Sequence, residues 1–139
     1  MESLHYLLMK THTVLQRRIS SRASEMGLTP GQPKVLDYLF RYGESDQKTI
    51  ASYCEIEQAT AGSILLRMEK AELIKRSRHE GNRRSLFVSL TPKGTAAAKE
   101  LMHIFRDAEE DATADLTPEE LEAFKKTLDR ICSAVQKHS

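Results

Sequence analysis

Positively charged side chains are concentrated in one short segment of this 139-residue chain, between residues 75 and 94. The segment has a single acidic residue, Glu80, against six cationic residues: Lys75, Arg76, Arg78, Arg83, Arg84 and Lys93. Phosphate contacts supply much of the affinity of proteins for duplex DNA, and they require lysine and arginine side chains held on one face. The composition of this segment therefore predicts a surface that binds a polyanion.

A second group of candidate binding residues lies before the cationic segment, in a helix predicted to begin near residue 58. Its members are small or polar: Gln58, Ala59, Thr60, Gly62, Ser63 and Arg67. Glutamine can form two hydrogen bonds to adenine, alanine and threonine methyl groups can contact the thymine methyl group, and hydroxyl groups can bind bases or phosphates. Glycine lets a helix approach its ligand closely. We therefore expect the start of this helix to contact base edges in a major groove.

Net charge alone does not reveal these features, because 21 Lys and Arg residues and 20 Asp and Glu residues give a formal net charge of +1. The acidic residues gather in a different part of the chain, between residues 107 and 122: Asp107, Glu109, Glu110, Asp111, Asp115, Glu119, Glu120 and Glu122. The chain is thus dipolar, and its acidic segment can stay away from DNA. With 40% hydrophobic and 29% charged residues, the composition is typical of a folded domain and excludes a disordered chain.

Apolar residues at helical spacing predict the elements that position these groups. A long helix is expected over residues 3–26, and a second one from Thr29 to Tyr42, with Thr29 as N-cap, Pro30 at the first helical position and Gln32 completing a capping box. The apolar face of the second helix is Val35, Leu36, Leu39 and Phe40. A short third helix over residues 47–54 follows a cap at Ser45 or Asp46, and the fourth helix buries Ala61, Ile64, Leu65 and Met68.

The apolar spacing then changes to that of strands. Strands are predicted over residues 74–78 and 86–90, joined by residues 79–85, and their tip at residues 81–84 could place an arginine in a minor groove. A fifth helix begins near Thr91, and a sixth follows a capping box at Thr117. The fold is therefore predicted to be mainly α with a small β-hairpin, a winged helix-turn-helix with extra N- and C-terminal dimerisation helices.

The outer helices are more apolar than one small domain needs, which favours a homodimer in which they pack against copies of themselves. We expect a single domain over residues 1–139. Its DNA-binding lobe would span residues 29–94, and its dimerisation helices would lie in residues 1–26 and 95–138.

Three segments of the sequence resemble the MarR (multiple antibiotic resistance regulator) family of bacterial transcription factors. They are residues 28–36 (LTPGQPKVL), the predicted helix-turn-helix from residue 48 to residue 69, and residues 82–94 (NRRSLFVSLTPKG). The last segment is similar to the family's D-x-R wing followed by a strand, Leu-Thr and a glycine. The resemblance implies a homodimer that straddles a pseudo-palindromic operator, and repression relieved by a small ligand or an oxidant.

Arg84 matches the wing arginine of the family, whereas two positions depart from the pattern. Asn82 replaces the wing aspartate, so the ion pair that usually steadies the wing is missing. Glu72 replaces the glycine that usually ends the recognition helix. The first departure questions the rigidity of the wing, and the second questions the turn after the recognition helix.

The ligand implied by the resemblance would be a small aromatic or amphipathic effector bound near the first, second and fifth helices. Candidate lining residues are Tyr6, His12, Arg17 and Tyr38. Cys54 and Cys132 are expected to be packing residues, and the chain has no cysteine before Cys54, which argues against the peroxide sensing of some relatives. The five histidines show no metal-ligand spacing, so no metal or other cofactor is expected.

An enzyme is not expected, because the chain lacks phosphate-binding glycine loops, a nucleophile elbow and a zinc-protease motif. No segment has the length and apolarity of a membrane span or the pattern of a signal peptide, so we expect a cytoplasmic protein without a membrane partner. The alternative function is a winged-helix module that binds another protein and has no sequence-specific DNA binding.

Overall fold

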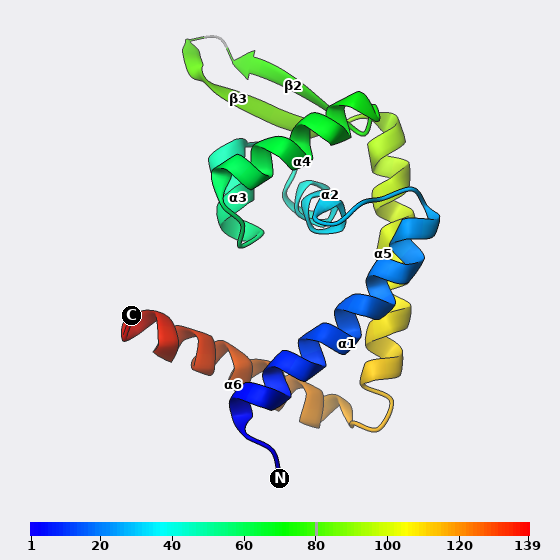
Figure 1. Ribbon diagram of the computed structural model, residues 1–139, viewed down its shortest axis with the longest axis vertical. Helices are drawn as coiled ribbons and strands as arrows, with labels where there is room; N and C mark the ends of the chain where they lie inside the picture. Colours follow the sequence, from blue (N-terminus) through cyan, green and yellow to red (C-terminus); the bar gives the residue numbers. More distant parts are fainter. Residues whose placement is uncertain (80) are drawn as a thin grey trace. The chain divides into compact units, whose positions relative to one another are not determined.

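The computed structural model describes residues 1–79 and 81–139, and of these the side chains of residues 82–85 are not described. The chain divides into two compact units, residues 1–105 and residues 106–139. Figure 1 shows the order of elements, which is α1 (Leu4–Glu25), α2 (Gln32–Tyr42), β1 (Ser45–Asp46), α3 (Gln47–Tyr53), α4 (Gln58–Lys70), β2 (Ile74–His79), β3 (Asn82–Leu90), α5 (Pro92–Ala112) and α6 (Pro118–Lys137). This order confirms the predicted winged helix-turn-helix fold.

The predicted start of α2, at Pro30 after a Thr29 N-cap, was two residues too early. Thr29, Pro30 and Gly31 form a turn in which the Gln32 N–H donates to the Thr29 carbonyl oxygen at 3.1 Å, and α2 begins at Gln32. The Gln32 side chain still accepts a hydrogen bond from the Thr29 N–H at 3.1 Å, so half of the predicted capping box forms. Pro33, and not Pro30, occupies the first turn of the helix.

Two further details of the first unit differ from the sequence prediction. Phe40 is exposed, and the buried aromatic residue of α2 is Tyr38, because Tyr42 and Tyr53 pack against its ring. The hairpin connection is shorter than residues 79–85, because β2 continues to His79 and β3 begins at Asn82. Once two strands are aligned, backbone pairing can continue through polar residues without an apolar alternation.

The strands form an antiparallel sheet in the order β1-β3-β2. β1 was not predicted, since two residues are too short to show a period; it pairs Ser45 with Val88 and Asp46 with Phe87. Asp46 also caps α3, as predicted, by accepting a hydrogen bond from the Thr49 N–H at 2.8 Å. Hydrogen bonds from Thr49 lower the pKa of the Asp46 carboxyl below its usual value. The sheet and α3 therefore share one anchoring residue.

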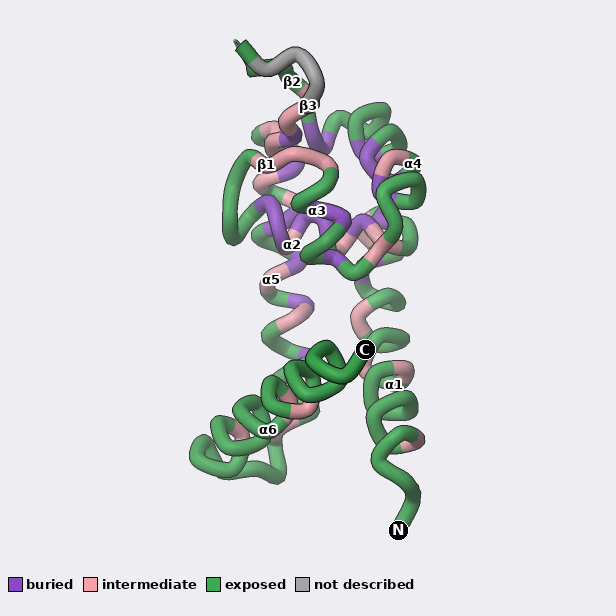
Figure 2. Tube along the Cα trace, turned by 90° about the vertical axis from the view of Figure 1, so that its left-hand side faces the viewer, coloured by how far each residue is buried: buried purple, intermediate pink, exposed green. Residues whose placement is uncertain are grey.

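The core of the first unit is formed by α2, α3, α4, the strands and the first part of α5, which contributes Ala98, Leu101 and Ile104. Figure 2 shows buried residues gathered on these elements, whereas most residues of α1 are exposed. α4 contributes Ala61, Ile64, Leu65 and Met68, the four residues predicted from their spacing. Burial of each larger side chain contributes about 2 kcal/mol relative to exposure, so this face fixes the orientation of α4 and leaves its opposite face free for a ligand.

α4 ends in a turn that requires a left-handed residue, and Glu72 occupies that position with φ of 62°. The Glu72 N–H donates to the Glu69 carbonyl at 2.9 Å, and the Leu73 N–H donates to the Met68 carbonyl at 2.9 Å. This is the Schellman pattern that usually ends with glycine. Leu73 and Met68 are buried beside this turn, and their packing holds Glu72 in the left-handed conformation, which glutamate rarely adopts.

The start of α5 is bound directly to this turn. The Thr91 hydroxyl donates to the Glu72 carbonyl at 2.6 Å and accepts from the Gly94 N–H at 3.0 Å. The Lys93 ammonium donates to the Ala71 carbonyl at 2.9 Å. A Cβ atom on Gly94 would lie 1.9 Å from the Leu73 carbonyl oxygen. The Thr-Pro-Lys-Gly segment is thus a clamp between the end of α4 and the start of α5, and Lys93 is engaged in it.

The second unit, residues 106–139, contains the end of α5 and all of α6. The predicted capping box is present: the Thr117 N–H donates to Glu120 at 3.0 Å, and the Glu120 N–H donates to the Thr117 hydroxyl at 3.1 Å. No residue of α6 is buried, and Phe124 and Val135 are at least half exposed. No helix within the described residues is long and apolar enough to cross a membrane.

We predict that Gly94→Ala destabilises the protein by about 3 kcal/mol or more, because the new methyl group would overlap a backbone oxygen that cannot move without breaking the clamp. Gly62→Ala is the matched control. There the new methyl group meets the end of the flexible Gln47 side chain at 3.2 Å and gains helix propensity, so the free energy of unfolding should stay within about 1 kcal/mol of wild type. Urea unfolding at one protein concentration measures the free energy of unfolding of both variants. Equal losses of stability would contradict the special role of Gly94 in the clamp.

We also predict that Glu72→Gly stabilises the protein by about 1 kcal/mol, because glycine adopts the left-handed conformation without the steric cost that glutamate carries. The control is Glu100→Gly at an exposed helical position of α5, which should destabilise by about 1 kcal/mol. A lower urea midpoint for Glu72→Gly than for wild type would show that the glutamate side chain contributes more than its strain costs.

Candidate nucleic-acid interface

The start of α4 presents one continuous exposed face. Its members are the predicted residues Gln58, Ala59, Thr60, Ser63 and Arg67, together with Leu66, which sequence analysis did not include. The Ser63 hydroxyl donates to the Ala59 carbonyl of its own helix at 3.3 Å. The face is narrow and lacks bulky side chains near its N-terminus, as a helix that enters a major groove requires.

Gly62 is positioned differently from the other predicted residues of α4. It is partly buried, and a Cβ atom there would lie 3.2 Å from the Gln47 side-chain nitrogen. That nitrogen donates to the Gln58 carbonyl at 3.0 Å and so joins the first residue of α3 to the first residue of α4. The small size of Gly62 therefore makes room for the junction between the two helices, and the glycine faces α3.

Successive residues of a strand point to opposite sides, so the neighbours Lys75 and Arg76 of β2 have different surroundings. Lys75 and Arg78 are exposed, as expected for residues that contact phosphate. Arg76 lies on the same side as the buried Ile74, its side chain is only 18% exposed, and its Nε atom is 3.6 Å from a Glu69 carboxylate oxygen. The structure therefore places Arg76 against α4. The side chains of Arg83 and Arg84 lie outside the described residues.

The family model that matches this chain is that of the MarR family, over residues 28–86, which includes α2, the helix-turn-helix and most of the hairpin. The transcriptional repressor Rv2887 of Mycobacterium tuberculosis is 28% identical over 130 residues, which cover 94% of each chain. Over this central region the chain is similar to MarR-family regulators.

Solved structures of MarR-family regulators have the same fold. A DNA complex of Staphylococcus aureus MepR has a TM-score of 0.88 at 22% identity and covers 96% of this chain and 99% of that one. Bordetella bronchiseptica BpsR, whose DNA binding is regulated by 6-hydroxynicotinic acid, has a TM-score of 0.79 at 25% identity. The match covers 94% of this chain and 99% of the BpsR chain. The matching curated proteins are described as helix-turn-helix transcriptional repressors and regulators, and this chain shares the fold of the solved structures.

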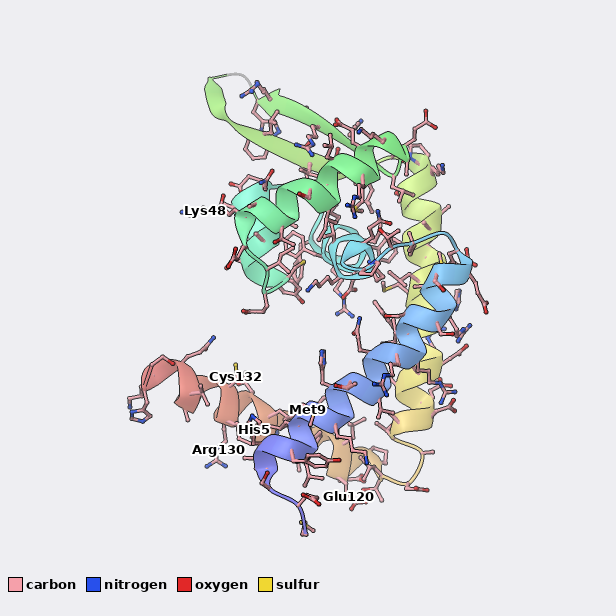
Figure 3. All side chains as sticks on the ribbon, in the orientation of Figure 1. His5, Met9, Lys48, Glu120, Arg130 and Cys132 are labelled. Carbon is pink, nitrogen blue, oxygen red and sulfur yellow. The ribbon has the colours of Figure 1, made fainter. Side chains whose placement is uncertain are left out.

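The first unit also contains a tyrosine cluster, which the sequence analysis did not predict. The rings of Tyr38, Tyr42 and Tyr53 lie 4.9–5.4 Å apart between centroids, and the Tyr38 hydroxyl is 2.9 Å from the Ser45 hydroxyl. A hydrogen bond with Tyr42 raises the pKa of Tyr53. The cluster lines a shallow cavity of about 740 Å³ together with Lys48, which extends from α3 in Figure 3, and with Thr49 and Ser52. Tyr38 and Tyr53 come together only through the packing of α2 on α3.

A second cavity in the first unit is smaller and more enclosed, at about 540 Å³. It is lined by α1, by the start of α2, by the turn after α3 and by α5: His12, Gln16, Ile19, Gly31, Pro33, Lys34, Cys54, Glu55 and Phe105. The four predicted ligand residues are not brought together. His12 lines this cavity and Tyr38 lines the other, while Tyr6 lies under the Lys10 ammonium at 5.8 Å and Arg17 lines neither.

The two cysteines occupy different environments. Cys54 is buried, its Sγ atom lies 3.5 Å from the Lys34 carbonyl oxygen, and burial raises the pKa of its thiol, which agrees with the predicted packing role. Cys132 is exposed on α6, where Figure 3 labels it. Among residues 1–79 and 81–139, no group of three or more histidine, cysteine or acidic side chains is placed to hold a metal ion.

We predict that Lys75→Ala and Arg76→Ala affect DNA binding differently. Lys75→Ala should reduce the slope of log affinity against log salt concentration by about 1 for each lobe, because one phosphate contact is lost. Arg76→Ala should leave that slope unchanged and lower the thermal stability, because it removes a partner of Glu69. Fluorescence anisotropy titrations measure the slopes, with Lys99→Ala on α5 as the control for a remote charge. Equal slope changes for both variants would show that Arg76 also contacts phosphate.

Proposed function

We propose that this protein is a homodimeric repressor that binds a pseudo-palindromic operator and is released by a small aromatic ligand. The observation that carries the proposal is the exposed, small and polar face of α4 beside the exposed cations of β2. Two such faces in a dimer would occupy successive major grooves about 34 Å apart. Such a regulator acts where the chromosome is, which for a bacterial protein is the cytoplasm, and it needs no catalysis.

Base contacts would come from Gln58, Ala59, Thr60 and Ser63, and Arg67 would reach phosphates from the same face. The wing, β2 and β3, would bring Lys75, Arg78, Arg83 and Arg84 to the flanking backbone and minor groove. Gly62 supports this surface through the Gln47 junction, and Arg76 supports it through Glu69. Residues 29–94 would thus form the DNA-binding lobe.

Exposed apolar side chains on the outer helices support the dimer. α1 exposes Leu4, Leu7, Leu8, Met9 and Val14, and α6 exposes Phe124 and Val135. Exposed apolar residues gathered on amphipathic helices are typical of an interaction surface. We propose that residues 1–26 and 95–138 cover these surfaces in a homodimer.

The more enclosed cavity is the better candidate for the effector site. His12 and Lys34 supply a polar and a cationic group beside the apolar Ile19 and Phe105, a combination suited to a planar aromatic acid. A ligand there would contact both α1 and the turn between α3 and α4, so its occupancy could favour a spacing of the lobes that does not fit the operator.

The experiment that tests the function is selection of bound duplexes from a random DNA library, followed by anisotropy titration of the winner and of a scrambled duplex at several salt concentrations. We expect an inverted repeat bound at least ~1,000-fold more tightly, with a log–log salt slope of about −7 for roughly eight phosphates. Arg84→Ala should abolish this affinity. If no motif emerges and both duplexes bind weakly, the alternative of a winged-helix module for a protein partner is favoured.

The same titration tests the effector site, with 6-hydroxynicotinic acid as the probe. The probe should weaken operator binding of wild type and have no effect on His12→Ala, while Tyr38→Phe in the other cavity should still respond. If the probe displaces DNA from His12→Ala as well, the effector does not bind in the proposed cavity.

A further inference from the structure

A histidine at the end of β2 joins the wing to the body of the first unit. The His79 ring stacks on Phe87 of β3, with centroids 3.7 Å apart and an interplanar angle of 8°. Its Nε2 atom lies 2.5 Å from a carboxylate oxygen of Glu44, a residue of the loop before β1. The contact therefore connects three segments that are distant in sequence.

Glu44 lies on a fixed support. The next residue, Ser45, pairs with Val88 in the sheet, and its hydroxyl is bonded to the Tyr38 hydroxyl at 2.9 Å and to the Gly43 carbonyl at 3.2 Å. Tyr38 and Val88 are both buried. The Glu44 side chain thus extends from a backbone segment that is bound to the core, whereas the His79 side chain comes from the outer end of the hairpin.

The hairpin needs such a connection near its end. The β2–β3 register is regular from Ile74↔Leu90 to Ser77↔Phe87, and it shifts before His79↔Asn82. Regular ladder hydrogen bonding is interrupted at such a shift, which leaves the outer strands less constrained.

The sign of the charge on Glu44 is informative. A carboxylate near the wing of a DNA-binding lobe repels phosphate, so by electrostatics alone its removal should strengthen binding. Glu44 is 38% exposed and His79 is 47% exposed, so neither is needed to fill the core. The presence of the Glu44 carboxylate is therefore explained better by its contact with His79 than by a contact with DNA.

We propose that Glu44 and His79 are positioning residues for DNA binding: their pair, together with the stacking of His79 on Phe87, holds the end of the wing so that its cations meet the DNA backbone. The proposal rests on the proposed function. The wing of this protein is thereby connected to the loop between α2 and β1, which lies 35 residues before His79 in the sequence.

Three substitutions of acidic residues test the proposal in anisotropy titrations on the selected operator. Glu44→Ala removes the partner of His79 and should weaken binding about two- to fivefold for each lobe, the range expected when an exposed side-chain hydrogen bond that favours the competent wing is lost. Glu44→Gln keeps an oxygen that can accept a hydrogen bond from His79 and removes a charge, so its affinity should equal or exceed that of wild type. Glu57→Ala, at the exposed N-cap of α4, is the charge control and should bind at least as tightly as wild type.

A double-mutant cycle and hydrogen exchange distinguish the positioning role of the Glu44–His79 pair from a general effect on charge or stability. Glu44→Ala should cause no further loss in a His79→Ala background, and it should speed amide exchange in residues 79–87 while the core helices keep their protection. One outcome would contradict the positioning role alone. In that case Glu44→Ala binds the operator as tightly as Glu57→Ala does, and wild type still prefers the operator to scrambled DNA, so the proposed function is unaffected. If wild type does not discriminate between the duplexes, the proposed function fails first and the positioning role fails with it.

Discussion

The carbonyl oxygen of Leu73 occupies the space where any residue other than glycine at position 94 would place its Cβ atom. Around this contact the structure gathers the end of α4, the start of β2 and the start of α5, through hydrogen bonds from Thr91 and Lys93. The direction of the proposed recognition helix and that of the wing are therefore set at one point. Because the contact is between backbone atoms, side-chain repacking cannot substitute for it, and the exposed face of α4 depends on it.

The cations of the hairpin serve two purposes that the sequence does not distinguish. Lys75 and Arg78 are exposed, whereas Arg76 lies against Glu69 and Lys93 binds the Ala71 carbonyl. At least two cations of the basic segment, Arg76 and Lys93, thus connect elements of the lobe to one another. A guanidinium or ammonium group can do this because its long apolar stem packs against the protein while its head reaches a distant acceptor. The total positive charge of a segment therefore overstates the charge that it offers to phosphate.

The two units differ in what stabilises them. In the first unit, α2, α3, α4, the sheet and the first part of α5 surround a continuous core. In the second unit, α6 begins with a complete capping box and carries an apolar stripe, yet none of its residues is buried. A helix of this kind gains most of its stability from packing, and caps alone contribute only about 1 kcal/mol each. The proposed homodimer would supply that packing, which would tie the stability of the second unit to assembly.

Much of this protein follows from its sequence. The spacing of Ala61, Ile64, Leu65 and Met68 determined the buried face of α4, and the Thr117 capping box determined the start of α6, because both depend on neighbours within one helical turn. Other features required the tertiary structure. Gly62 against Gln47 and Glu44 beside His79 depend on segments that are 15 and 35 residues apart in sequence. The same limit explains the tyrosine cluster and the dispersal of the expected ligand residues, since helical periodicity identifies the buried side of an element but not the element that it meets.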